Sequence, residues 1–136
     1  MDIKKLIPQR SPIIMVDELL RVEGDEAVCQ LCVREDNFFI DSDHLMAEPG
    51  LIEHIAQSAS AFAGYKAIAD GATEPPVGYI GEVKNFHLYA RPKIGDVITT
   101  TITMGPEVEG ITIIRGESKV GDDIIADTTM KIFIKE

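Results

Sequence analysis

The chain has 136 residues, 45% of them hydrophobic, and a formal net charge of −10. This size predicts one domain over residues 1–136, with a core large enough to fold without disulfides or metal ions. The acidic excess argues against nucleic-acid binding, and no apolar stretch reaches the roughly 20 residues that span a bilayer. The N-terminus has no apolar signal-peptide segment, so we expect a cytoplasmic protein.

The first part of the chain predicts a short helical turn and two strands. A helical start near Asp2–Leu6 precedes an extended region from Ile13 to Val22 and a hairpin at Glu23–Asp25. The next strand carries Cys29 and Cys32, and its alternation places the two thiols on opposite faces. There is no second cysteine pair and no histidine at ligand spacing. We therefore expect structural cysteines, no disulfide and no metal site.

One long helix is predicted after this strand. Pro49 suits its first turn, where the missing N–H needs no partner, and Asp70-Gly71 provides a stop after Ala69. At 100° per residue one face is apolar, and its members are Leu51, Ile52, Ile55, Ala56, Ala59, Phe62 and Ala63. No charged residue stands between His54 and Lys66. We therefore expect the helix to be surrounded by protein on most sides.

After the helix the hydrophobic pattern changes to the period of two that is typical of strands. The expected strands are Val77–Tyr89, Val97–Met104, Ile111–Val120 and Ile124–Ile134. A turn is expected at residues 91–96 and a loop at residues 105–110. The chain is thus an α+β protein with one helix and five to six antiparallel strands. A sheet wrapped around the helix is the simplest way to bury both.

Glu53 and His44 are the candidate acid–base pair, because they lie on either side of the helix start. Burial at this place favours the protonated carboxyl, which a general acid needs. The alternative is that Glu53 is only a first-turn acid that complements the helix dipole. His54 lies about 100° around the helix from Glu53, so we expect it on the surface or at an interface. His87 lies in a strand, where we see no acidic partner for it.

Several short motifs run through the chain. They are Ile7–Pro12 with Met15-Val16-Asp17, Phe38-Phe39 with a later histidine, Gly50-x-x-Glu53 with Ala56-Gln57, and Lys84–Phe86 with Arg91-Pro92 and Gly95-Asp96. This set resembles the 3-hydroxyacyl-acyl-carrier-protein dehydratases over essentially the whole chain. The short spacing from Gly50 to Glu53 is most similar to the divergent members from aryl-polyene and related pigment pathways. The resemblance implies a hotdog fold, built as a dimer with active sites at the subunit interface.

The reaction that the resemblance implies is elimination of water from a 3-hydroxyacyl thioester on acyl carrier protein, in fatty-acid or polyene biosynthesis. His44 would remove the proton next to the thioester carbonyl, and Glu53 of another subunit would protonate the leaving hydroxyl. Gly50 and Gln57 would bind the substrate, and no cofactor or metal is implied. The implied assembly is a homodimer or higher oligomer, or a heterodimer with a paralogue.

Two other functions remain open at this point. A hotdog thioesterase needs only a helix carboxylate to direct water onto the thioester and does not depend on the histidine. A non-catalytic subunit would instead complete the site of a catalytic paralogue. Because the chain as a whole is negative, docking of an acidic carrier protein needs a local basic patch, for which Lys84, Arg91 and Lys93 are the candidates.

Overall fold

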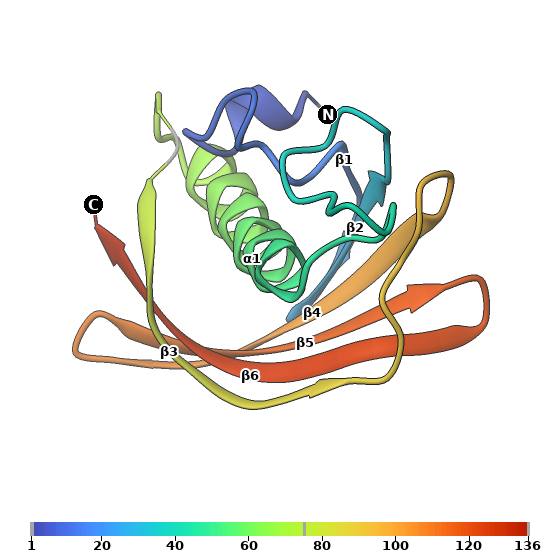
Figure 1. Cartoon of the computed structure of the whole chain (residues 1–136). Coiled ribbons are helices and arrows are strands. Elements are labelled where there is room, and N and C mark those ends of the chain that lie inside the picture. Colours follow the sequence, from blue (N-terminus) through green and yellow to red (C-terminus); the bar gives the residue numbers. More distant parts are fainter. Residues whose placement is uncertain (1, 75, 136) are drawn as a thin grey trace.

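The computed structural model describes residues 2–74 and 76–135, and Figure 1 shows one curved sheet around one long helix. The helix α1 spans Glu48–Ala69. The strands are β1 (Glu18–Glu23), β2 (Glu26–Cys32), β3 (Val77–Leu88), β4 (Val97–Val108), β5 (Ile111–Val120) and β6 (Asp123–Lys135), and a short 3₁₀ helix, η1, covers Ile3–Lys5. This arrangement confirms the expected hotdog architecture.

The sheet is antiparallel throughout, in the order β1-β2-β4-β5-β6-β3. Hairpins join β1 to β2, β4 to β5 and β5 to β6, and Gly24 and Gly121 adopt positive φ angles of 57° and 61° in two of their turns. Glycine suits these positions because a Cβ disfavours the left-handed region. Strand β3 follows the helix in sequence and pairs with β6 alone among the described strands, so one edge of β3 is free.

Strand β4 is longer than the sequence pattern predicted. It continues beyond Met104 through Gly105 and Pro106, a segment that we expected to be a loop, and ends at Val108. Its pairing with β5 shifts register between Met104 and Glu107. Proline has no N–H for a regular ladder, and such an irregularity lets the strand accommodate it.

The N-terminal segment covers the side of α1 that the sheet leaves open, as Figure 1 shows. Leu6, Ile7 and Val16 are buried and pack with helix residues in one apolar cluster. A Cβ on Gly64 would lie 2.0 Å from the Leu6 carbonyl oxygen, so only glycine permits this close approach. All residues from His54 to Phe62 are buried, which confirms that protein surrounds this part of the helix on most sides.

Both cysteines are free, and they lie on opposite faces of β2 as expected. Cys29 Sγ is 3.8 Å from the Ser58 carbonyl on α1, whereas Cys32 Sγ is next to the Gln30 amide. Burial raises the pKa of the Cys29 thiol to about 12, which makes it unreactive. Within residues 2–74 and 76–135 no three metal-ligating side chains gather in one place, and no helix is long and apolar enough to cross a membrane.

Candidate active site

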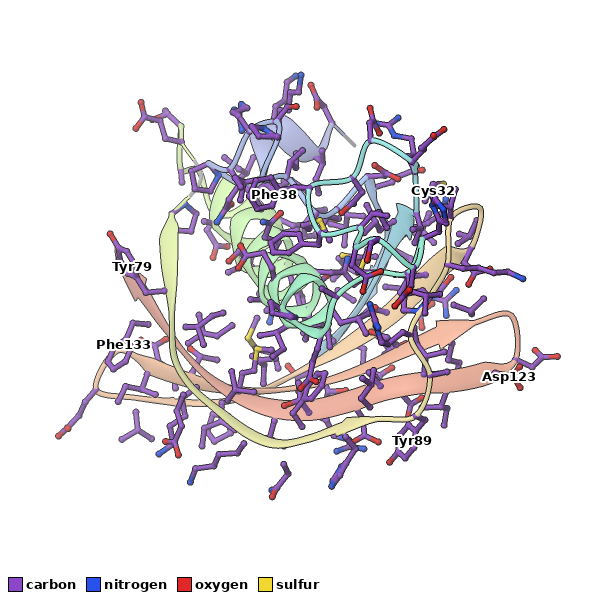
Figure 2. The ribbon with its side chains drawn as sticks, in the orientation of Figure 1. Cys32, Phe38, Tyr79, Tyr89, Asp123 and Phe133 are labelled. Atoms are coloured by element: carbon purple, nitrogen blue, oxygen red, sulfur yellow. The ribbon has the colours of Figure 1, made fainter. Side chains whose placement is uncertain are left out.

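A cavity of about 200 Å³ opens beside Glu53, between α1 and the free-edge strand β3. Glu53 and Ser60 line it from the helix, Gln9 from the N-terminal segment, and residues 78–80 from β3. Tyr79, which pairs with Phe133 across the sheet, marks this end of the fold in Figure 2. Ile132 of β6 completes the lining, so the cavity brings together residues from four separate parts of the chain.

Gln57 holds Glu53 in place. Its Nε2 donates to Glu53 Oε1 at 2.8 Å and to the Ile13 carbonyl at 2.9 Å. Its Oε1 accepts from the Met15 N–H at 2.6 Å. The Gln57 side chain is 1% exposed, so its amide is fixed by the N-terminal segment and one face of it is presented to the carboxylate. Glu53 Oε2 has no hydrogen bond to any residue that the structure describes.

Arg91 fastens the loop that precedes α1. Its Nε donates to the Met46 carbonyl at 2.9 Å, and its guanidinium forms an ion pair with Asp41. The hydrogen bond from Arg91 holds the pKa of the Asp41 carboxyl below its ordinary value. The Met46 N–H also donates to the Pro92 carbonyl at 2.9 Å. The segment after β3 thus determines the position of the loop over residues 41–46.

His44 lies within this fastened loop. Its backbone has a φ of +64°, its N–H donates to the Asp41 carbonyl at 3.1 Å, and its side chain is exposed. No hydrogen bond among the described residues joins His44 to Glu53. Within one chain the candidate acid and base are therefore held by separate elements, the helix for Glu53 and the loop for His44.

Gly50 allows the same loop to close on the start of the helix. A Cβ at this position would lie 2.6 Å from Phe39 Cβ and 2.9 Å from Met46 Cγ, which is closer than side-chain atoms can pack. The Gly50 N–H donates to the Ala47 carbonyl at 2.9 Å. In this structure the contribution of Gly50 is therefore close packing.

His54 is completely buried, so the expectation of a surface or interface position was wrong. Its Nδ1 lies 2.6 Å from the Met15 carbonyl oxygen and its Nε2 lies 2.8 Å from Thr100 Oγ1, which is 2.7 Å from Ser118 Oγ. A carbonyl only accepts, so Nδ1 carries the proton, Thr100 donates to Nε2, and Ser118 donates to Thr100. Burial lowers the pKa of His54 to about 4, and the ring is neutral at neutral pH.

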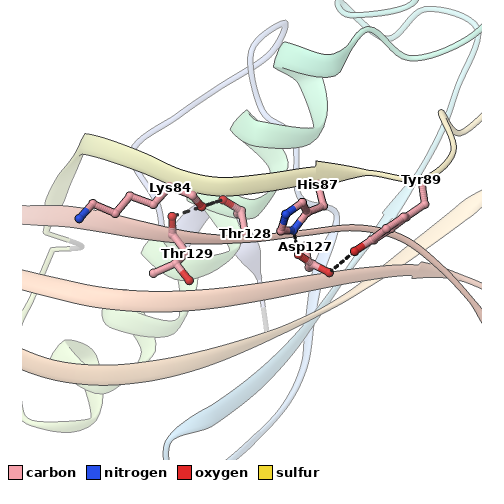
Figure 3. Close-up of polar contacts among 6 residues, drawn as sticks. All are labelled: Lys84, His87, Tyr89, Asp127, Thr128 and Thr129. Atoms are coloured by element: carbon pink, nitrogen blue, oxygen red, sulfur yellow. Dashed lines mark hydrogen bonds and ion pairs between the residues drawn. The ribbon is translucent and has the colours of Figure 1, made fainter.

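His87 has an acidic partner, contrary to the expectation from sequence. Figure 3 shows His87 of β3 and Tyr89, which follows the end of β3, on either side of Asp127 of β6. His87 Nδ1 is 2.9 Å from Asp127 Oδ1, and the Tyr89 hydroxyl donates to Oδ2 at 3.0 Å. Asp127 alternates with buried Ala126 and Thr128, so this group faces away from the helix. The pairing of β3 with β6 brings the three together, and local sequence gave no indication of it.

The structure therefore brings Glu53 and Gln57 together and places Gly50 and His44 at the loop that covers the helix start. The structure also places Gln9 in the cavity wall, although no role was predicted for it from sequence. Its position within the Ile7–Pro12 motif was the one sequence feature that could have pointed to it. Of the three candidate docking cations, Arg91 is used to fasten the loop, Lys84 Nζ is 3.7 Å from Glu82 Oε1, and Lys93 is exposed.

Many solved structures share this fold, among them these three. The dehydratase heterocomplex ApeI:P from Xenorhabdus doucetiae matches with a TM-score of 0.92 at 14% identity, over 100% of this chain and 92% of that chain. A hypothetical thioesterase from Streptococcus pneumoniae, solved with coenzyme A, matches with a TM-score of 0.68 at 12% identity, over 87% and 84%. The E. coli PaaI protein of the phenylacetic acid degradation operon matches with a TM-score of 0.68 at 9% identity, over 85% and 81%.

The similarity to these structures establishes the hotdog fold. The family assignment comes from the sequence, because the family model of the ApeP-like proteins, described as ApeP dehydratase, matches residues 1–136. The match covers every motif from Ile7–Pro12 to Gly95-Asp96, and it confirms the expected relationship to hotdog dehydratases. The chain belongs to the ApeP-like dehydratase family.

Proposed function

We propose that this protein eliminates water from a 3-hydroxyacyl thioester carried by acyl carrier protein, in fatty-acid or polyene biosynthesis. The observation that carries the proposal is the cavity beside Glu53, in which one oxygen of a carboxyl is held by Gln57 and the other faces no described partner. A carboxyl fixed in this way protonates a leaving hydroxyl without first having to reorient. Membership of the ApeP-like dehydratase family supports the same reaction class.

In this proposal Glu53 is the general acid and His44 is the base that removes the proton next to the thioester carbonyl. The exposed ring of His44 makes no hydrogen bond to Glu53 in the described part of its own chain, so we propose that the two meet across a subunit interface. Gln57 contributes by orienting Glu53. Gly50 contributes by letting the His44 loop close on the helix start, where the dipole of α1 also favours negative charge on the substrate.

We further propose that the partner is a second hotdog chain, either another copy of this chain or a paralogue. The free edge of β3 supports this, because it forms one wall of the cavity and its backbone groups are available for another strand. The solved ApeI:P structure is a heterocomplex by name, which supports the paralogue in particular. Two free cysteines suit a reducing compartment, in keeping with the cytoplasm.

The alternative function is acyl thioester hydrolysis, which the similarity to the hypothetical thioesterase from S. pneumoniae favours. In that case Glu53 activates water and His44 has no role. One experiment separates the two. The protein, alone and with a paralogue, is incubated with a 3-hydroxyacyl thioester while the absorbance of the conjugated enoyl product and the release of free thiol are followed.

Conjugation without thiol release is the expected result. Thiol release without formation of the conjugated product would show that the protein is a thioesterase and not a dehydratase. If neither signal appears with this chain alone and both its Glu53 and its His44 prove dispensable in the complex, this chain is a non-catalytic subunit and the proposal is overturned.

A further inference from the structure

The side-chain oxygen of Gln9 is buried and has no hydrogen-bond partner among the residues that the structure describes. The backbone around it is fixed, since Arg10 donates to the carbonyls of Ile7 at 2.8 Å, Gln9 at 2.8 Å and Lys4 at 2.9 Å. Buried acceptors in folded proteins nearly always have a donor. An unpartnered one that lines a cavity is therefore a place where a ligand can supply the missing hydrogen bond.

The cavity that Gln9 lines is the one beside Glu53. Its volume of about 200 Å³ is well above the roughly 10–15 Å³ that one water needs on the same measure, so the cavity has room for a segment of a thioester substrate. Ser60 adds a hydroxyl, Gln57 and Tyr79 also line the cavity, and its apolar members are Ala56, Ile80 and Ile132. The cavity thus combines the Glu53 carboxyl with a buried amide oxygen, that of Gln9, which has no partner among the described residues.

A 3-hydroxyl group needs both a donor and an acceptor in such a site. In the proposed reaction a base takes the proton from C2, the C2–C3 double bond forms, the C3–O bond breaks, and the proton of Glu53 goes to the departing oxygen. No electrons are exchanged with another reagent. Glu53 accordingly acts as the donor to the hydroxyl oxygen, and the hydrogen of the hydroxyl itself still needs an acceptor.

We infer that Gln9 is this acceptor: its side-chain oxygen binds the hydrogen of the substrate 3-hydroxyl and then that of the departing water. The inference rests on the proposed function and adds a specificity-determining residue to it. A saturated acyl chain has no hydrogen-bond donor at C3. A 3-oxo group has only an acceptor there, which cannot bond to the Gln9 oxygen. The site therefore selects the 3-hydroxyacyl substrate over both, because only the hydroxyl gains a hydrogen bond to the buried oxygen.

The test compares two thioesters that differ only in the 3-hydroxyl. Binding of a 3-hydroxyacyl pantetheine thioester and of its saturated analogue is measured on the assembled protein, in a Glu53→Gln background that slows turnover of the first enough for binding to be measured before it is consumed. Gln9→Leu should weaken binding of the hydroxyacyl ligand by about fivefold to tenfold, as for the loss of one hydrogen bond, and leave the saturated ligand within about twofold. Gln30→Leu, the same change on β2 outside the cavity, should alter neither.

A second variant keeps the test informative if Gln9→Leu does not fold. Gln9→Asn retains the amide but withdraws its oxygen by one methylene, and it should also weaken the hydroxyacyl ligand alone. Equal weakening of both ligands, or of neither, in a folded Gln9 variant would overturn the inference while leaving the proposed function intact. If the protein with Gln9 present binds neither thioester, the proposed function fails first and the inference fails with it.

Discussion

The carboxyl of Glu53 is the residue on which the proposed chemistry depends. Glu53→Gln keeps the shape and much of the hydrogen bonding but removes the transferable proton, so turnover should fall about 10²-fold to 10⁴-fold. The enoyl absorbance assay measures this. Glu48→Gln is the matched control, because Glu48 is an exposed acid in the first turn of the same helix. Unchanged turnover and melting temperature in Glu53→Gln would show that Glu53 only complements the helix dipole.

His44 separates the two candidate reactions. The variant His44→Asn is preferable to alanine, because asparagine tolerates the φ of +64° found here. A dehydratase that uses His44 as its base should lose roughly as much activity as with Glu53→Gln, whereas a thioesterase that uses Glu53 should lose little. His87→Asn serves as the control, since it removes another exposed imidazole that lies against Asp127. Full dehydration by the His44 variant would remove the base from the proposed mechanism.

His54 makes folding sensitive to acid. Its pKa is about 4 in the folded chain and 6.5 when unperturbed, so between these values the unfolded chain binds a proton that the folded chain does not. The stabilisation is complete above pH 6.5 and is lost as pH falls towards 4, by on the order of 3 kcal/mol. The negative charge of Asp17 opposes this effect, because it raises the pKa of His54. Urea unfolding of wild type and His54→Gln is measured at both ends of this pH range. The free energy of unfolding should fall less on acidification in the variant than in wild type. An equal fall in both proteins would mean that carboxylates, and not His54, cause the acid sensitivity.

The residues of the site differ in how far sequence could identify them. Glu53 and Gln57 stand four apart on one helix, and this spacing alone places them side by side. The surroundings of Gln9, His54 and His87 depend on tertiary structure. Gln9 lines the cavity, His54 contacts Thr100 on β4, and His87 contacts Asp127 on β6. His54 was misplaced because helical periodicity describes one helix face and does not show that the N-terminal segment covers it.

At the scale of elements, the loop before α1 depends on the segment after β3. Arg91→Ala removes the ion pair with Asp41 and the bond to the Met46 carbonyl. Both side chains are about one-third exposed, so the melting temperature should change little. Hydrogen exchange at Leu45 and Met46 should become faster, and dehydration should fall because His44 is no longer held. Lys93→Ala is the control, because Lys93 is a neighbouring exposed cation. Unchanged hydrogen exchange in Arg91→Ala would show that the loop keeps its conformation without Arg91.

The bounds of several helices and strands could be predicted from local sequence features such as a proline, a helix stop or an alternating pattern. Pro49 and Asp70 indicated the two ends of α1, and both indications were correct. Alternation identified β5 over Ile111–Val120 exactly where the structure has it. The end of β4 was missed because Pro106 reads as a break, whereas the neighbouring register shift allows the strand to continue. Strand order also lay beyond sequence, since β3 pairs with β6 and not with a neighbour in the chain.

At the scale of the whole molecule, the reason to expect a partner changes. From sequence, a dimer was expected because of the resemblance to the hotdog dehydratases. In the structure the N-terminal segment covers the side of the helix that the sheet leaves open, and residues 54–62 are buried within a single chain. What remains incomplete is the edge of the sheet. Strand β3 has an unpaired side, and the same strand forms a wall of the cavity beside Glu53.

We therefore expect the functional species to have at least twice the mass of one 14.9 kDa chain, either alone or with a paralogue. Sedimentation at micromolar concentration measures this. Ile80→Lys places a charge on β3 at the wall of the cavity and should shift the protein to a single-chain species and abolish dehydration. Ile124→Lys is the matched control, because Ile124 is exposed to a similar extent, 43% against 39%, on the β5–β6 hairpin. A 14.9 kDa species that dehydrates its substrate unaided would rule out a site shared between subunits.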